Sequence, residues 1–242
     1  DGVLQAIFES VHAPYCGCRV LASSLCMDKA VFKTLLSRHG IPQLSFYIVD
    51  DHGMTTNAIE ETLENVRKTI EIPFFVKPAN SGSSVGISKV SDINQLDAAM
   101  TLARQHDSKI IIEEGLTDFK EIEIAVLGNA DLIISPPGQL KPSQEFYSYD
   151  EKYVLNQTEC TIPAKLPQNL IDDAKMIAER AYRLCDCRGF ARVDLFVKDD
   201  KVYLNEINTL PGFTDISMYP RLMQSCDISY TELISRIIEL AY

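Results

Sequence analysis

Segments with a helical repeat of apolar residues alternate along this chain with short runs of β-branched and aromatic residues. Apolar side chains that recur about every 3.6 residues line one face of a helix, whereas short β-branched runs favour strands. The alternation predicts an α/β (α+β) fold in which helices pack on sheets. With 242 residues, 46% of them hydrophobic, the chain can fill one large core or two smaller ones.

The individual elements can be placed from their patterns. A helix is predicted at 28–40, where Asp precedes the first turn and Gly and Pro follow the last, and another at 229–242, which opens with a capping box. Further helical faces span 59–70, 93–103 and 170–184. Strands are predicted at 73–77, 87–90, 109–113, 122–127, 192–197 and 202–207. The run 132–153 contains Pro136, Pro137, Gly138 and Pro142 and is predicted to be one long loop, of the kind that often forms a lid.

Charge and cysteine usage narrow the class of protein. The formal net charge is −11 and there is no block of Lys and Arg, which argues against a nucleic-acid or membrane surface as a partner. The seven cysteines include the pairs Cys16/Cys18 and Cys185/Cys187, without the spacing of a zinc site, and are interpreted as reduced thiols of a cytoplasmic protein. No apolar run approaches the ~20 residues that span a bilayer, and residues 1–9 lack a signal-peptide pattern.

The strongest chemical signal is a predicted β-hairpin at 192–208, in which a short polar turn joins two strands. Alternate residues of a strand share a face, so Arg192, Asp194 and Phe196 lie together. The turn brings position 194 opposite 205 or 206, although sequence does not choose between these two registers. Either register makes Asp194 and Glu206 neighbours.

Two neighbouring carboxylates on one face favour a bound cation. Unit charges ~4 Å apart repel by about 4 kcal/mol at an effective dielectric of ~20. Asp194, Glu206 and the amide of Asn208 offer only oxygen ligands, which suits Mg²⁺. The alternative, solvated strand residues balanced by Arg192, stays open from the hairpin alone. The irregular segment that follows contains Gly212, which allows a ligand to approach the backbone closely.

A second cluster follows the strand that ends at Lys77. Residues 78–86 form a loop of small residues whose backbone N–H groups can surround phosphate oxygens, with Lys77 supplying positive charge. The loop matches neither the P-loop nor the dinucleotide-binding pattern, and an ordinary Gly/Ser turn remains the alternative. Glu113 and Glu114 end another apolar strand, where they are either solvated or accept hydrogen bonds from a ribose or adenine.

Five motifs occur in a fixed order along the chain: Met27–Lys29, Val76–Gly86, Tyr149–Tyr153, Arg192–Asp194 and Asn205–Thr214. Together they resemble the D-alanine-D-alanine ligases of the ATP-grasp superfamily over essentially the whole chain.

The resemblance implies an ATP-grasp fold, in which two α+β subdomains clamp ATP. Residues 1–28 would be the tail of an N-terminal substrate domain, 29–121 the central subdomain, and 122–242 the C-terminal subdomain with the metal site and lid. The family's N-terminal domain supplies a glutamate and a histidine that hold the first D-alanine, and this chain begins after the point where they occur.

The resemblance also implies a reaction. ATP phosphorylates the carboxylate of one D-alanine, and the amine of a second D-alanine attacks the acyl phosphate, in peptidoglycan precursor synthesis. The implied cofactors are ATP and two Mg²⁺ ions, with Mn²⁺ as a substitute, and the implied state is a cytoplasmic homodimer with no nucleic-acid or membrane partner. A D-alanine-D-serine ligase and a truncated ATP-binding module without ligase activity are the alternatives.

Residue roles come from the matching motif positions. Nucleotide binding is implied for Lys29, Lys77, Ser84, Glu113, Glu114, Leu116, Glu121, Phe75 and Phe196. Catalytic roles are implied for Arg192, Gly212, Ser83, Tyr153 and Lys152, and metal binding for Asp194, Glu206 and Asn208, with Glu206 as the bridging ligand. Ser217 would hold the carboxylate of the second D-alanine. Met218 would favour its methyl group over the hydroxyl of D-serine, because a hydroxyl would find no polar partner there.

Overall fold

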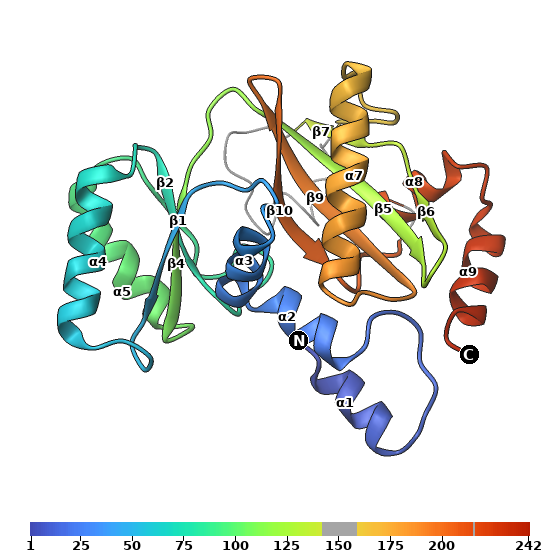
Figure 1. Cartoon of the computed structure of the whole chain (residues 1–242), viewed down its shortest axis with the longest axis horizontal. Coiled ribbons are helices and arrows are strands. Elements are labelled where there is room, and N and C mark those ends of the chain that lie inside the picture. The colour runs from blue at the N-terminus through green and yellow to red at the C-terminus, as the bar shows by residue number, and fades with distance from the viewer. Residues whose placement is uncertain (142–158, 215) are drawn as a thin grey trace.

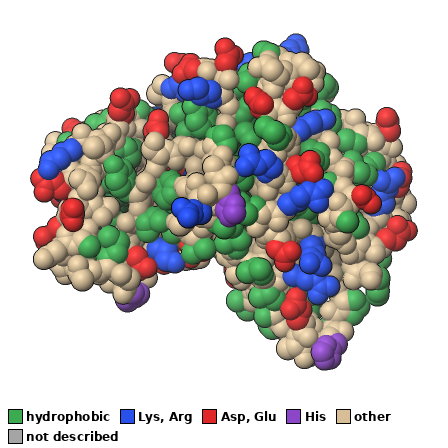
Figure 2. All heavy atoms as spheres, viewed as in Figure 1, with side chains coloured by type: hydrophobic (Ala, Val, Ile, Leu, Met, Phe, Trp, Pro, Cys, Tyr) green, Lys and Arg blue, Asp and Glu red, His purple; other side chains and the backbone are tan. Residues whose placement is uncertain are grey.

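The structure is a computed structural model that describes residues 1–141, 159–214 and 216–242. Among these residues no helix is both long enough and apolar enough to cross a membrane. On the face shown in Figure 2, acidic and basic side chains lie interspersed.

Two antiparallel sheets lie side by side (Figure 1). The small sheet has the strand order β1-β4-β2-β3, with the following bounds: β1 Phe46–Asp50, β4 Lys109–Glu114, β2 Phe74–Pro78 and β3 Ser88–Val90. The large sheet has the order β10-β9-β5-β7-β8, and a further strand, β6, pairs with β5. Its bounds are β10 Lys201–Asn208, β9 Phe190–Lys198, β5 Lys120–Gly128, β7 Gly138–Lys141, β8 Glu159–Thr161 and β6 Leu132–Ile134.

Helices cover both sheets. On the small sheet, α4 (Thr56–Thr69) and α5 (Leu96–Arg104), the latter preceded by the 3₁₀ turn η1 (Ile93–Gln95), pack on one face around a buried core. On the large sheet, α7 (Gln168–Leu184) packs across β5, β9 and β10. The core on the opposite face of that sheet is built with α8 (Met218–Gln224) and α9 (Tyr230–Glu239). The N-terminal helices α1 (Val3–Ser10) and α2 (Val20–Met27) extend from the lower edge of the large sheet in Figure 1.

Helix α3 (Lys29–Arg38) lies between the two sheets (Figure 1). Ala30 packs with Ala79 and Ile111 of the small-sheet half, whereas Phe32 and Leu36 belong to the core of the large sheet. All five side chains are buried, so two different faces of one short helix are anchored in two cores. This arrangement leaves the remaining face, which carries Lys29 and Lys33, directed toward the space between the sheets.

The sequence predictions were confirmed for the elements with clear periodicity. Asp28 caps α3 by accepting hydrogen bonds from the N–H groups of Ala30 (3.0 Å) and Val31 (3.1 Å). Ser229 caps α9 by accepting from the N–H of Glu232 (3.2 Å). All six predicted strands and the three other predicted helices are present.

The prediction of one long loop at 132–153 was wrong, because β6 and β7 lie within it. These strands are short and are held by pairing with β5. Because Pro and Gly lie at their ends, the local sequence pattern indicated a loop. The remainder of that run, 142–153, lies outside the described residues. The sequence analysis also did not predict the strands β1 and β8 or the short helices α1, α2 and α8.

Replacing Asp28 with Ala is expected to lower the free energy of unfolding by about 1–2 kcal/mol, because α3 loses its cap. The carboxylate also forms an ion pair with Lys109 (2.7 Å), so Asp28→Asn, which keeps the cap and loses the charge, separates the two contributions. Urea unfolding followed by circular dichroism measures both. An Asp28→Ala protein as stable as the unmodified chain would show that the cap does not hold α3.

Candidate functional site

A cavity of about 1130 Å³ lies between the two sheets. Twelve of the residues that the sequence analysis assigned to a site line its wall: Lys29, Phe75, Lys77, Ser83, Ser84, Glu113, Glu114, Leu116, Glu121, Phe196, Glu206 and Asn208. They come from α3, from both sheets, from the loop after β2 and from the segment between β4 and β5. The tertiary structure therefore gathers most of the predicted residues around one space.

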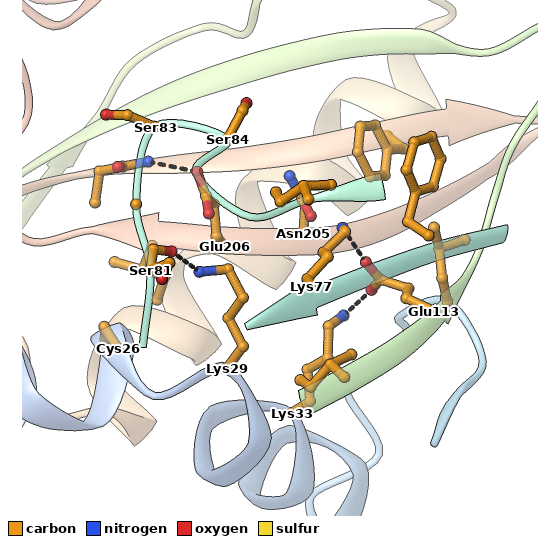
Figure 3. Close-up of a pocket in the computed structure, with 18 of the residues that line it drawn as sticks. Cys26, Lys29, Lys33, Lys77, Ser81, Ser83, Ser84, Glu113, Asn205 and Glu206 are labelled. Carbon is orange, nitrogen blue, oxygen red and sulfur yellow. Dashed lines mark hydrogen bonds and ion pairs between the residues drawn. The ribbon is translucent and has the colours of Figure 1, made fainter. Parts of the chain in front are cut away.

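A buried carboxylate with two lysines forms one wall of this cavity (Figure 3). Glu113 on β4 is 1% exposed, and its two oxygens form ion pairs with Lys33 of α3 and Lys77 of β2. Burial by itself would raise the pKa of Glu113, but the two lysines outweigh that effect and hold this pKa at about 2. The carboxylate is therefore ionised at every pH at which the protein works.

Lys29 lies at the first position of α3, beside the loop that follows β2. Its ammonium group donates to the carbonyl oxygen of Ser81 at 2.6 Å (Figure 3). Burial lowers the pKa of Lys29, and the negative charge of Glu206 opposes this effect. Lys29, Lys33 and Lys77 together make this side of the cavity suited to an anion.

The loop after β2 has an unusual backbone. Ser83 and Ser84 have φ angles of +53° and +62°, in the left-handed region that few residues other than glycine adopt. Gly86 follows with φ +72°, and a Cβ there would lie 2.5 Å from the ring of His106. The loop therefore turns tightly where Ser83 and Ser84 line the cavity.

Two aromatic rings line the cavity from different sheets, Phe75 from β2 and Phe196 from β9. Phe119 packs edge-on against Phe196, with ring centroids 5.1 Å apart. The segment between β4 and β5 passes close to the small sheet, because a Cβ on Gly115 would lie 2.4 Å from the carbonyl oxygen of Pro73. This part of the cavity offers apolar surface to a planar group.

The hairpin of β9 and β10 carries the predicted metal ligands. Glu206 pairs with Asp194, and a register shift between Leu204 and Glu206 leaves Asn205 as an extra residue. Of the two registers that the sequence left open, the structure adopts the one with 206 opposite 194. The amide nitrogen of Asn208 lies 2.9 Å from Asp194 Oδ2 and 3.4 Å from Glu206 Oε1, so both carboxylates surround one amide.

Arg192 lies on β9 two residues before Asp194 and contacts the same group of polar side chains. Its guanidinium donates two hydrogen bonds of 2.7 Å to the oxygens of Asp194 and lies 3.3 Å from Glu123 Oε2. Glu123 lies on β5, directly opposite Asp194 in the register of β5 and β9, and is 4% exposed. The sequence analysis gave Glu123 no role, although its alternation with Glu121 was a signal that it shares the face of the site.

The residue types fit a hard divalent cation, since two carboxylates and an amide can supply oxygen ligands. A bound cation would require the amide of Asn208 to turn its oxygen, in place of its nitrogen, toward the carboxylates. In the part of the chain that the structure describes, no group of three or more His, Cys, Asp or Glu side chains has the arrangement of a metal site. The predicted ligands are Asp194 and Glu206 with Asn208, of which Glu206 and Asn208 line the cavity.

Other predicted residues lie away from the cavity wall. Ser217 accepts a hydrogen bond from the N–H of Thr214 (3.0 Å), and a Cβ on Gly212 would lie 2.9 Å from Ser217 Oγ, so these residues belong to one turn. Met218 is buried, and its sulfur lies 2.9 Å from the sulfur of Cys160. Lys152 and Tyr153 lie outside the described residues.

Residues 35–239 match the family model described as D-ala D-ala ligase C-terminus. The chain is 47% identical to the D-alanine–D-alanine ligase of Caldicellulosiruptor bescii and 44% identical to that of Acetivibrio thermocellus, in both cases over its whole length. It covers 66% and 64% of those relatives, so it spans slightly less than two thirds of their length.

Two solved structures are similar over the whole chain. One is the VanG D-Ala:D-Ser ligase of Enterococcus faecalis, with a TM-score of 0.88, 35% identity and 69% of that chain covered. The other is the D-alanine-D-alanine ligase of Coxiella burnetii, with a TM-score of 0.84, 32% identity and 64% covered.

Two antiparallel α+β units with a lysine-lined cavity between them place this chain in the ATP-grasp fold class, as the sequence resemblance implied. Within that class, the chain belongs to the D-alanine–D-alanine ligase family. Membership of this family implies the use of ATP and a divalent metal.

The ion pairs of Glu113 predict a pH dependence of stability. The folded-state pKa of about 2 lies below the usual 4.5, so Glu113 stabilises the fold above pH 4.5, and this contribution is lost as the pH falls toward 2. We expect Glu113→Gln to be less stable than the unmodified chain by roughly 3–5 kcal/mol at neutral pH, because the buried Lys33 and the partly exposed Lys77 lose their counter-charge. The difference should shrink on acidification.

Denaturant unfolding of the two proteins at several pH values measures this difference, in which the contributions of titrating groups far from Glu113 cancel. A difference that stays constant between pH 5 and 2 would show that the stabilisation comes from packing and not from charge.

Proposed function

We propose that this chain forms the ATP- and Mg²⁺-binding part of an enzyme that joins two D-alanine molecules. The observation that carries the proposal is the pairing of a lysine-lined wall with a carboxylate–amide cluster across one cavity. Phosphoryl transfer requires mainly positioning and neutralisation of negative charge, and these residues supply both.

The nucleotide would lie between the two sheets. Its base fits between Phe75 and Phe196, near Glu114, Leu116 and Glu121. Its phosphates would contact Lys29, Lys77 and the backbone of the loop at Ser83 and Ser84, which line the cavity together with the lysines.

The metal would bind at the hairpin. Asp194, Glu206 and Asn208 would hold two Mg²⁺ ions, with Glu206 shared between them and Mn²⁺ as a substitute. Bound metal neutralises phosphate charge and orients the transferred group. Asn208 would then present its carbonyl oxygen, and Arg192 would orient Asp194 through its paired hydrogen bonds.

The ligation steps are proposed from the family motifs. One D-alanine carboxylate would accept phosphate from ATP to form an acyl phosphate, and the amine of a second D-alanine would displace that phosphate. Arg192 and the backbone of Gly212 would stabilise the oxyanion of the tetrahedral intermediate. Ser217 would bind the second carboxylate, and Ser83, Lys152 and Tyr153 would close over the substrates.

The setting of the reaction is proposed on the same basis. The product D-alanyl-D-alanine is a precursor of peptidoglycan, so the enzyme would act in the cytoplasm, as a homodimer. Residues 1–28 would belong to a substrate domain, 29–121 to the central subdomain and 122–242 to the C-terminal subdomain.

A second candidate is ligation of D-alanine to D-serine. It is favoured by the similarity to the VanG D-Ala:D-Ser ligase over the whole chain. Met218 supports D-alanine instead, since it is buried among apolar side chains and offers no partner for a hydroxyl group.

An assay of the full reading frame that encodes this chain, with ATP, Mg²⁺ and equal amounts of D-alanine and D-serine, separates the candidates. We expect phosphate release and mainly D-alanyl-D-alanine, detected by mass spectrometry. Mainly D-alanyl-D-serine would support the second candidate. Nucleotide binding without phosphate release or dipeptide would leave an ATP-binding module and would refute the ligase proposal.

Replacing Glu206 with Gln is expected to lower the rate of Mg²⁺-dependent phosphate release about a hundredfold, because the shared metal ligand loses its charge. The matched control is Asp199→Asn, which removes an exposed carboxylate from the turn of the same hairpin. Thermal unfolding should be nearly unchanged in both variants. Near-normal activity of Glu206→Gln would refute the bridging role.

A further inference from the structure

Lys33 is given no nucleotide or metal contact in the function proposed above, yet it lines the same cavity. It is one helical turn after Lys29, so both side chains emerge from the same face of α3. Its side chain is 3% exposed, lines the cavity from the interior side and forms an ion pair with Glu113 (Figure 3). A lysine is rarely buried to this degree, because removing an ammonium group from water is costly.

The charges around Glu113 do not cancel. Lys33 and Lys77 contribute two positive charges and Glu113 one negative charge, so one positive charge remains in excess. The side chain of Lys77 is 16% exposed, against 3% for Lys33, so Lys77 is the more accessible of the two. The ammonium group of Lys77 also lies 5.5 Å from the centre of the Phe75 ring.

The geometry separates the roles of the two lysines. Lys33 contacts Glu113 Oε1 and lies 5.6 Å from the ring of Phe46, on the interior side of the carboxylate. Lys77 contacts the other oxygen, Oε2. Without Lys33, the charges of Glu113 and Lys77 would cancel, and this wall would attract an anion less strongly, through Lys29.

We propose that Lys33 is a positioning residue that neutralises Glu113 from the interior and thereby leaves the charge of Lys77 available to the phosphate groups of a bound nucleotide. This inference rests on the proposed function, in that it takes the anion in the cavity to be a nucleotide phosphate. Lys33 acts through Glu113 and Lys77 and does not itself touch the nucleotide.

Isothermal titration calorimetry with ADP and with adenosine tests this role. In Lys33→Met we expect ADP to bind on the order of tenfold more weakly, since one unit of charge is lost near the phosphates, and adenosine to bind as in the unmodified chain. Lys33→Arg keeps the charge and should keep most of the ADP affinity. Lys201→Met is the matched control, the same substitution at an exposed lysine away from the cavity.

A second variant distinguishes charge from packing. Lys33→Met combined with Glu113→Gln leaves Lys77 as the sole charged member of the group, so the excess positive charge returns. This double variant also avoids burying an unpaired charge, and it remains informative where Lys33→Met is too unstable to purify. We expect the double variant to bind ADP severalfold more tightly than Lys33→Met, whereas a purely structural role of Lys33 predicts no recovery.

Three outcomes would overturn the inference. The first is equal ADP affinity in Lys33→Met and the unmodified chain, and the second is a double variant that binds ADP as weakly as Lys33→Met. The third is a parallel loss of adenosine affinity, which would indicate a distorted cavity. If the unmodified chain binds neither ADP nor adenosine, the proposed nucleotide site itself fails, and this role of Lys33 fails with it.

Discussion

The ion pairs of Glu113 connect the elements on which the cavity depends. Lys33 reaches the carboxylate from α3 and Lys77 reaches it from β2, while Glu113 itself lies on β4. Since α3 is also anchored in the core of the large sheet, these contacts link the two halves of the molecule at the wall of the cavity. A buried carboxylate with two cations is costly to separate, so it constrains both the position of α3 and the electrostatic potential beside it.

The opposite wall depends on the irregularity in β10. The extra residue at Asn205 changes the register, so that Glu206 pairs with Asp194 and Asn208 pairs with Arg192. Polar groups of neighbouring strands thereby meet on one face, where Arg192 offsets the repulsion between the carboxylates of Asp194 and Glu123. The same hairpin places Phe196 two residues beyond Asp194, so one strand contributes to the proposed metal site and to the proposed base site.

Much of this arrangement was predictable because its signals are local. The cap at Asp28, the alternation in β9 and the sequence of small residues after Lys77 each depend on neighbours in the chain. Strands β6 and β7 were missed because they are defined by pairing with β5, and Glu123 was missed because its partners lie on another strand. Glu113 was left between two interpretations, and the lysine that accounts for its burial is eighty residues earlier in the chain.

By itself, the sequence determined the mixed α/β class, the main helices and strands, and the residue types that suit phosphate and Mg²⁺, because periodicity and side-chain chemistry are properties of short segments. Only the tertiary structure decided the register of the hairpin, the position of α3 between the sheets, and the excess positive charge around Glu113. Each of these depends on contacts between segments that are far apart in the chain. Packing and electrostatics bring such segments together, and no local sequence pattern encodes those interactions.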